Sequence, residues 1–275
     1  MIKDVMVSLD GSAADQTRLH AAESIADLYD GRIIGLFVNL LPALLAADAD
    51  MAALGTVSLI EKAKKEGDRV KEDLTKRLIA LGRPVEIRRF DAFIEESAGI
   101  AAREARSADA FVGLLPNESR EPNDLVESVL FGSGRHLFLA PHGKPETKFH
   151  FESILIAWNG SREATRALAE AMPYMRRAKS VEVVLVSEDA TDEPEAIVAD
   201  EVLDHLEHHG IPAELRHIMN PKESVGKALL EEARRRDADV LVMGGYGHSR
   251  LREWLLGGVT YELLNSSSVP LIIAH

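Results

Sequence analysis

The sequence repeats itself, and this repeat limits the folds that the chain can adopt. Residues 3–38 read as an apolar strand, a tight turn that ends in Gly-Ser, an amphipathic helix and a second apolar strand, and residues 152–186 read in the same way. The match continues further along both halves: "EIRRF" pairs with "ELRHI", "SADAFVGLL" with "DADVLVMGG", and "RHLFLAP" with "VPLIIAH". Each half therefore predicts a series of five strands that alternate with helices. The Ser that follows Gly in each turn is predicted to be the N-cap of the first helix of its half.

Short, continuous apolar strands that alternate with helices are typical of a parallel sheet covered on both faces. With right-handed crossovers, each half becomes a doubly wound, Rossmann-like α/β domain. We expect two tandem five-stranded domains of this kind, residues 1–141 and 152–275, joined by a polar, proline-containing linker at 142–151. Pairing "HLFLA" with "PLIIA" would cover two apolar edge strands, so we predict an intramolecular pseudo-dimer and leave further homodimerisation open.

The chain is acidic and lacks cysteine, which excludes several classes of function. Its net charge is −13 with a pI near 5.3, so we expect neither nucleic acid nor an anionic membrane as a partner. Without cysteine there is no disulfide, thiol nucleophile or thiolate metal ligand. The start "MIKDVMVSLDGS" turns acidic too soon for a secretory signal, and no uncharged apolar run is long enough to span a membrane, so we expect a cytoplasmic protein.

Residues 40–54 are unusually apolar and rich in alanine. They predict a short amphipathic helix that covers the core or the other half, with a lid or a partner-docking helix as the alternative. The segment that follows, "IEKAKKEGDRVKEDLTKRL", has opposite charges three and four residues apart, which predicts a solvated helix face.

A glycine-rich stretch, "MGGYGHSRLREWLLGG" (243–258), follows the fourth predicted strand of the second half. Gly244 and Gly247 permit positive φ and close backbone approach, and a helix predicted from around Ser249 would present free N–H groups to an anion. Two better-known phosphate loops do not fit. The Lys-Ser/Thr ending of a Walker A loop is absent, and Arg250 stands where a dinucleotide fingerprint needs glycine.

The spacing that does fit is G-x2-G-x9-G, formed by Gly244, Gly247 and Gly257. Together with "GHS", with "DGS" and "NGS" after the first strand of each half, and with the tandem repeat, it resembles the universal stress protein family over essentially the whole chain. The resemblance implies that the loop binds the phosphates of ATP, or of ADP or AMP, with Mg²⁺ allowed beside the nucleotide. The binding residues that we predict on this basis are Ala157, Asn159, Gly160, Met243, Gly244, Gly247, His248, Ser249, Gly257, Gly258, Val259 and Thr260.

The second half departs from the family pattern at three positions. Gly258 stands where a Ser or Thr follows the last glycine, with Thr260 two residues later. Asn159 replaces the acidic residue that the family places near adenosine, and keeps hydrogen-bonding capacity without the charge. Trp158 precedes it and is expected either to stack on a base or to fill the space of the base.

The first half departs in the opposite way, because it keeps Asp10 but lacks the glycines. Alignment of the strands puts Leu114 opposite Gly244 and Asn117 opposite Gly247. The acidic side chains of the following segment would repel phosphate; they are Glu118, Glu121 and Asp124. We therefore predict that the first half is a partner domain that binds no nucleotide.

Few residues suggest catalysis or metal binding. His205, His208 and His209 share a predicted helix end and could ligate zinc or nickel, but a solvated helix end is the preferred interpretation, and we predict no metal site. Asp239 precedes the fourth strand of the second half, at the wrong end of the sheet for catalysis, so no catalytic residue is predicted.

The sequence leaves three functions open. The preferred one is a stress-response protein that binds an adenine nucleotide in its second half and acts as a ligand-regulated binding module. The second is a slow ATPase or phosphoryl-transfer enzyme that uses the same loop. The third is an interaction protein without nucleotide, which packing of Trp158 into the cleft would favour.

Overall fold

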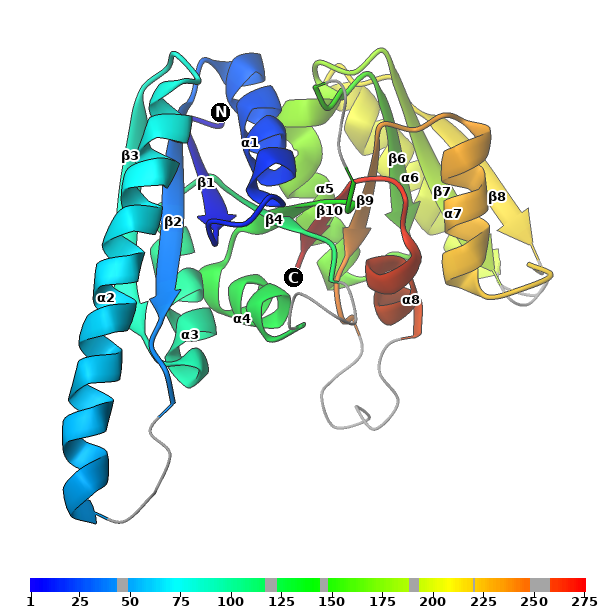
Figure 1. Ribbon diagram of the computed structural model, residues 1–275. Coiled ribbons are helices and arrows are strands. Elements are labelled where there is room, and N and C mark those ends of the chain that lie inside the picture. Colours follow the sequence, from blue (N-terminus) through cyan, green and yellow to red (C-terminus); the bar gives the residue numbers. More distant parts are fainter. Residues whose placement is uncertain (44–48, 117–122, 144–147, 188–192, 220, 248–257) are drawn as a thin grey trace.

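The structure is a computed structural model (Figure 1). It describes residues 1–275 apart from 44–48, 117–122, 144–147, 188–192, 220 and 248–257, and apart from the side chains of 49–56, 123 and 193–199. In this part of the chain, no helix is both long enough and apolar enough to span a membrane.

The helices and strands follow the predicted order in both halves. In the first half they are β1 (Asp4–Leu9), α1 (Asp15–Tyr29), β2 (Arg32–Leu40), α2 (Ala49–Ile79), β3 (Val85–Ala92), α3 (Ile94–Ala105), β4 (Ala110–Leu114), α4 (Asn123–Ser133) and β5 (His136–Ala140). In the second half they are β6 (Ser153–Trp158), α5 (Arg162–Met175), β7 (Ser180–Ser187), α6 (Glu193–His208), β8 (Glu214–Met219), α7 (Val225–Arg235), β9 (Val240–Gly244), α8 (Gly258–Ser266) and β10 (Leu271–Ala274).

All ten strands form one sheet, in the order β3-β2-β1-β4-β5-β10-β9-β6-β7-β8. Within each half the pairing is parallel and the strand order reverses beside the first strand, between β1 and β4 and between β6 and β9. The two tandem Rossmann-like folds meet where β5 pairs with β10 antiparallel, with Phe138 opposite Ile272. The predicted contact between "HLFLA" and "PLIIA" is confirmed.

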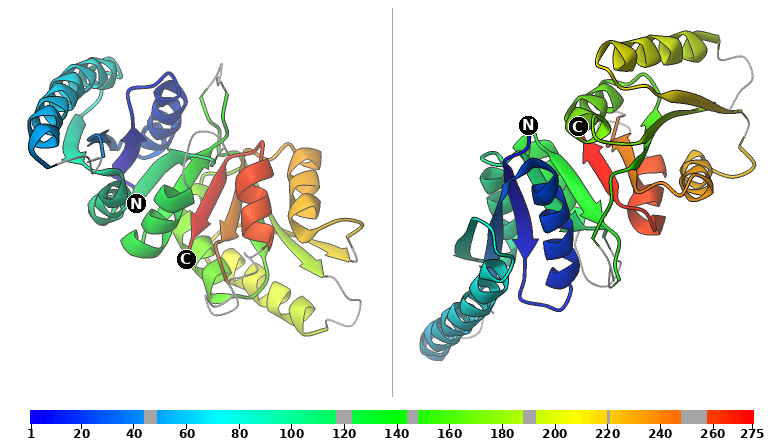
Figure 2. Two further views of the ribbon diagram at one scale, coloured as in Figure 1. Left: turned by 60° about the horizontal axis from the view of Figure 1, so that its bottom comes forward. Right: turned by 90° about the horizontal axis from the view of Figure 1, so that it is seen from above.

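Helices cover both faces of the sheet (Figures 1 and 2). On one face α1, α2, α5 and α6 pack over alternate strand residues such as Val5 and Val7. On the other face α3, α4, α7 and α8 pack over the intervening residues, of which Met6 is one. Because successive strand residues face opposite sides, this two-sided burial explains the unbroken apolar strands of the sequence.

The helix predicted at residues 40–54 is not short. One helix, α2, begins at Ala49 and continues through the charged segment to Ile79. Its C-terminal part packs on the first-half core through Leu74 and Leu78, whereas its N-terminal part projects past the carboxyl ends of the strands (Figures 1 and 2). The apolar and charged stretches therefore belong to a single helix, because no Gly-Pro sequence lies between them to end it.

Aromatic rings fill the joint between the halves. Phe138 on β5 is fully buried, and its ring lies 5.8 Å from Phe149 and 5.6 Å from Phe151. The Phe151 ring in turn stacks on Tyr174 of α5 at 5.2 Å. The end of the segment that we predicted as a polar linker thus packs as part of the core.

A buried polar chain crosses the same joint. His136, on β5 and 1% exposed, places Nδ1 3.0 Å from a carboxylate oxygen of Glu170 and Nε2 3.0 Å from the hydroxyl of Tyr174. Both partners lie on α5 of the second half. Buried polar groups of this kind are costly unless they are paired, so these bonds fix how the halves are seated on one another.

We expect Phe138→Ala to lower the free energy of unfolding by about 3–5 kcal/mol, because it leaves a cavity among buried rings of both halves. Urea denaturation should show both halves losing structure in one transition. Met219→Ala, at a 56% exposed position on β8, is the matched control and should change stability little. Loss of only the first half in the Phe138 variant would contradict the shared core.

Candidate functional site

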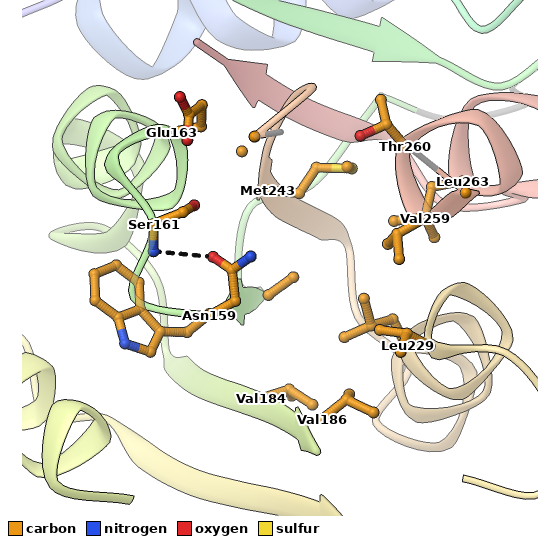
Figure 3. A pocket seen from close by; sticks show the side chains of 16 residues that line it. Asn159, Ser161, Glu163, Val184, Val186, Leu229, Met243, Val259, Thr260 and Leu263 are labelled. Atoms are coloured by element: carbon orange, nitrogen blue, oxygen red, sulfur yellow. Dashed lines mark hydrogen bonds between the residues drawn. The ribbon is translucent and has the colours of Figure 1, made fainter. Parts of the chain in front are cut away.

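The candidate site is a cleft at the carboxyl ends of β6 and β9, where the strand order of the second half reverses (Figure 3). Doubly wound sheets bind their ligands at such a switch point. The cleft has a volume of about 180 Å³. Its lining residues are Ala157, Trp158, Asn159, Ser161, Glu163, Val184, Val186, Val225, Leu229, Met243, Gly244, Gly247, Gly258, Val259, Thr260 and Leu263.

One side of the cleft is apolar. The side chains that form it come from β7, β9, α7 and α8; they are Val184, Val186, Met243, Leu229, Val259 and Leu263. Figure 3 shows Val184 and Val186 beside the end of β7, Met243 on β9, and Leu229, Val259 and Leu263 on helices α7 and α8. A surface of this kind suits a flat apolar group, with polar contacts left to the loops.

The loop after β6 is shaped by its own backbone and side chains. Gly160 has φ +69°, a left-handed conformation that glycine adopts without a Cβ clash. The Asn159 side-chain oxygen accepts a hydrogen bond from the Ser161 N–H at 3.1 Å (Figure 3), and the Ser161 hydroxyl accepts one from the Ala164 N–H at 3.1 Å. Ser161 is therefore the predicted N-cap of α5.

The same cap prediction is wrong for the first half. There α1 begins later, at Asp15, and its N-cap is Ala14, which makes no side-chain cap bond. The Ser12 hydroxyl instead accepts from the Ala14 N–H at 3.2 Å, in the turn before the helix.

The glycines after β9 permit close contact and do not take up positive φ. A Cβ on Gly244 would lie 2.5 Å from the Ala164 nitrogen and 2.6 Å from the Glu163 carbonyl carbon, both in the backbone of α5. Among the described residues of this loop, the one with positive φ is Tyr246, at +55°. Our expectation of positive φ at Gly244 and Gly247 was therefore wrong, and the requirement at Gly244 is steric.

Tyr246 connects the loop to two helices. Its N–H donates to the Thr260 hydroxyl of α8 at 3.2 Å, and its own hydroxyl donates to Glu127 of α4 at 3.1 Å. Its ring lies 5.4 Å from that of Phe131, also on α4. The loop of the second half is thus held by a helix of the first half.

The Trp158 side chain does not fill the apolar side of the cleft. Along β6, Ile154, Ile156 and Trp158 face the core under α5 and α6, whereas Ala157 faces the side of α7 and α8. Trp158 is 8% exposed and borders Leu168 as well as the edge of the cleft. Gly244 and Gly247 of the glycine-rich stretch line the cleft instead.

The structure brings together most of the predicted binding residues. Those that line the cleft are Ala157, Asn159, Met243, Gly244, Gly247, Gly258, Val259 and Thr260. Gly160 shapes the adjoining turn without lining the cleft. His248, Ser249 and Gly257 lie outside the described residues, as does the predicted helix start at Ser249.

Glu163 and most of the apolar side of the cleft were not predicted from the sequence. Glu163 lies in the first turn of α5, is 8% exposed, and places Oε2 3.2 Å from where a Cβ on Gly247 would stand. Figure 3 shows Glu163 and Thr260 on opposite sides of the end of β9. An acidic residue two positions after a Gly-Ser turn could have signalled Glu163, whereas Val184 and Leu229 look like any core residue.

The corresponding place in the first half is occupied by side chains. Leu114 and Leu115 are buried where the second half has Gly244 and Gly245, and their match is supported by equivalent bonds from the Leu115 and Gly245 N–H groups to the last strand of each half. The Asp15 carboxylate accepts from the N–H groups of Asp10 and Gly11 at 3.2 and 2.8 Å.

Arg18 completes this arrangement. Its Nη1 lies 2.6 Å from Asp15 and 3.1 Å from Asp10, and Arg18 is 3% exposed. The buried Arg18 thus neutralises Asp10 and Asp15 within the first half. Ala164 and Ala167 stand at the positions of Asp15 and Arg18 in the second half, which has no counterpart of this ion pair.

The histidines of α6 do not form a metal centre in the part of the chain that the structure describes. The rings of His205 and His209 lie 4.7 Å apart, edge to face, and His208 Nδ1 is 2.8 Å from the Asp204 carbonyl oxygen. Among the described residues, no three His, Asp or Glu side chains are grouped to hold a metal ion.

Fold and site together define a tandem doubly wound α/β protein with a cleft at the switch point of its second half. Comparison with known proteins then shows what the chain is similar to. Residues 150–275, close to half of the chain, match the sequence model of the universal stress protein family.

A curated relative and several solved structures are also similar to this chain. The stress response protein NhaX of Bacillus subtilis (strain 168) is 22% identical over 165 residues, which cover 46% of this chain and 98% of NhaX. A universal stress protein structure from Archaeoglobus fulgidus DSM 4304 has a TM-score of 0.73 at 18% identity, covering 98% of this chain and 97% of its own. A protein of unknown function from Pseudomonas aeruginosa PAO1 has a TM-score of 0.64 at 14% identity, covering 99% and 92%. These structures show that the fold is shared along the whole chain.

We expect Gly244→Ala to lower the free energy of unfolding by about 1–3 kcal/mol, because the new Cβ would meet the backbone of α5, which cannot rotate away. Gly258→Ala is the matched control, since a Cβ there meets nothing within 4 Å and alanine favours the start of α8. Urea denaturation of both variants checks this. Equal stability of the Gly244 variant and the wild type would contradict the close approach.

The Asp15 cluster predicts a pH dependence of stability. Burial, and secondly the nearby Asp10 charge, raise the pKa of Asp15 to about 6 against the opposing effect of Arg18. Between about pH 4, its unfolded pKa, and about pH 6 the folded state binds the extra proton, so the free energy of unfolding falls as pH rises through this window.

Asp15→Asn should remove this contribution, so that the wild type loses about 1–3 kcal/mol more than the variant between pH 4 and pH 7. Urea midpoints measured across that range test this prediction. Asp30→Asn is the control, because the Asp30 side chain is fully exposed and its backbone has a left-handed conformation that asparagine tolerates. Parallel curves for the wild type and Asp15→Asn would show that Asp15 does not titrate in this window.

Proposed function

We propose that the second half binds ATP or a related adenine nucleotide in the cleft between β6 and β9, and that the protein acts as a ligand-regulated binding module of the stress response. The observation that carries the proposal is the two-sided character of the cleft. Val184, Val186 and Leu229 form an apolar side suited to a base, whereas Gly244 and Gly247 bring bare backbone to the other.

The glycine end supports phosphate binding for a steric reason. A Cβ on Gly258 would meet nothing within 4 Å, and the three atoms nearest to a Cβ on Gly247 belong to the Glu163 carboxylate and the Ser161 hydroxyl. A phosphate can approach such backbone closely, and the start of α8 directs partial positive charge toward it. His248, Ser249 and Gly257 belong to the proposed phosphate loop on the strength of the family spacing.

The first half serves, in this proposal, as a partner domain that binds no nucleotide. Its switch point is occupied by Leu114, and its loop amides are already bonded to Asp15. We propose domain limits of 1–141 and 152–275, which place the nucleotide entirely in the second domain.

Slow hydrolysis is the alternative function, and one observation favours it. Glu163 places a carboxylate at the glycine end of the cleft, where an acid could orient a water molecule or a metal ion. Release of ADP from the purified protein, followed by turnover that Glu163→Gln abolishes, would establish this alternative.

The proposed function is tested by mass spectrometry of the small molecules released when freshly purified protein is denatured. We expect an adenine nucleotide from the wild type and none from Gly247→Val, because the added methyl groups would enter the space beside Glu163 and Ser161. Gly99→Val is the matched control, since a Cβ at Gly99 of α3 meets nothing within 4 Å.

If the wild type carries no nucleotide, ATP is titrated into it by calorimetry. Absence of binding at millimolar ATP would reject the proposal and favour an interaction protein. Equal nucleotide content in the wild type and Gly247→Val would place the nucleotide elsewhere in the molecule.

A further inference from the structure

Glu163 is nearly buried, and the described residues neutralise its charge only weakly. Its side chain is 11% exposed, and its ion pair is a 3.5 Å contact with the Nε of Arg162, whose own side chain is 79% exposed. A carboxylate taken out of water normally needs close hydrogen bonds or a near cation. The N-terminus of α5 supplies part of this stabilisation, but the carboxylate faces the cleft and Gly247.

The described lining of the cleft contains no lysine or arginine. Lys227, at the start of neighbouring α7, is 60% exposed and paired with Glu223 at 2.7 Å. The first half solves the same problem with Arg18, which is buried between Asp10 and Asp15, but Ala167 occupies the Arg18 position in the second half. Since the part of the chain that the structure describes places no close cation beside Glu163, a ligand could bring the positive charge.

We propose that Glu163 makes nucleotide binding conditional on a divalent cation, which its carboxylate holds together with the phosphate oxygens. The inference rests on the proposed function. Phosphates at Gly247 would lie beside a carboxylate of the same sign, and the two would repel in a poorly solvated site. Mg²⁺ and Mn²⁺ prefer carboxylate and phosphate oxygens, so either ion converts this repulsion into a shared contact.

The consequence is selection by charge. A nucleotide without the cation is disfavoured, whereas adenosine has no phosphates and is indifferent to the cation. Glu163 is thus a specificity-determining residue, and Gln at this position keeps the shape of the side chain and removes the repulsive charge.

The experiment is calorimetric titration of ATP and of adenosine, each with excess Mg²⁺ and with EDTA. It uses the wild type, Glu163→Gln and the control Glu223→Gln, an exposed acid on the turn before α7 that does not line the cleft. For the wild type and the control we expect ATP to bind at least about tenfold more tightly with Mg²⁺ than with EDTA. For Glu163→Gln we expect the ratio to fall below about threefold, chiefly because binding in EDTA improves. Adenosine should bind equally in all conditions.

The outcomes separate the inference from the proposed function. ATP that binds the wild type equally with Mg²⁺ and EDTA, or a Glu163→Gln variant that keeps the full Mg²⁺ dependence, would overturn the role of Glu163 and leave nucleotide binding standing. A Glu163→Gln variant that has lost its adenosine binding would show a role in the shape of the site and not in charge selection. Absence of binding by ATP and adenosine in every protein would overturn both.

Discussion

The antiparallel contact between β5 and β10 is the constraint on which the rest of the structure depends. Each half would otherwise expose the edge of an apolar strand, and such edges pair with other chains. Joining them makes one sheet of ten strands and buries Phe138 and His136 against residues of the other half. It also brings α4 of the first half beside the loop that follows β9.

The switch points of the two halves are built from different residues. In the first, Leu114 occupies the sheet end, and Asp15 and Arg18 satisfy the loop and one another. In the second, Gly244 lets α5 approach the strand end, and alanines replace the ion pair. One repeat has satisfied its loop with its own side chains, and the other presents glycine backbone and an acid to a cleft.

The sequence was sufficient for most of the fold, because the repeat, the unbroken apolar strands and the turns each have a local physical cause. It also located the cleft through Gly244, Gly247 and Asn159, whose spacing is readable along the chain. It was insufficient where the cause is a contact between distant segments. The need for glycine at 244 comes from the backbone of α5, the left-handed residue proved to be Tyr246, and Glu163 acquires meaning only when Gly247 is beside it. Likewise, Phe149 and Phe151 read as part of a linker until Phe138 is placed against them.

The contacts of Tyr246 have a consequence for how such a protein can change. Its hydroxyl and ring contact Glu127 and Phe131, so part of the support for the cleft of the second half comes from residues more than a hundred positions earlier in the chain. Through these contacts α4 of the first half helps to shape the cleft of the second half. A single-domain relative that used the same support would have to obtain it from a second chain, which makes fusion a way of guaranteeing that the support is always present.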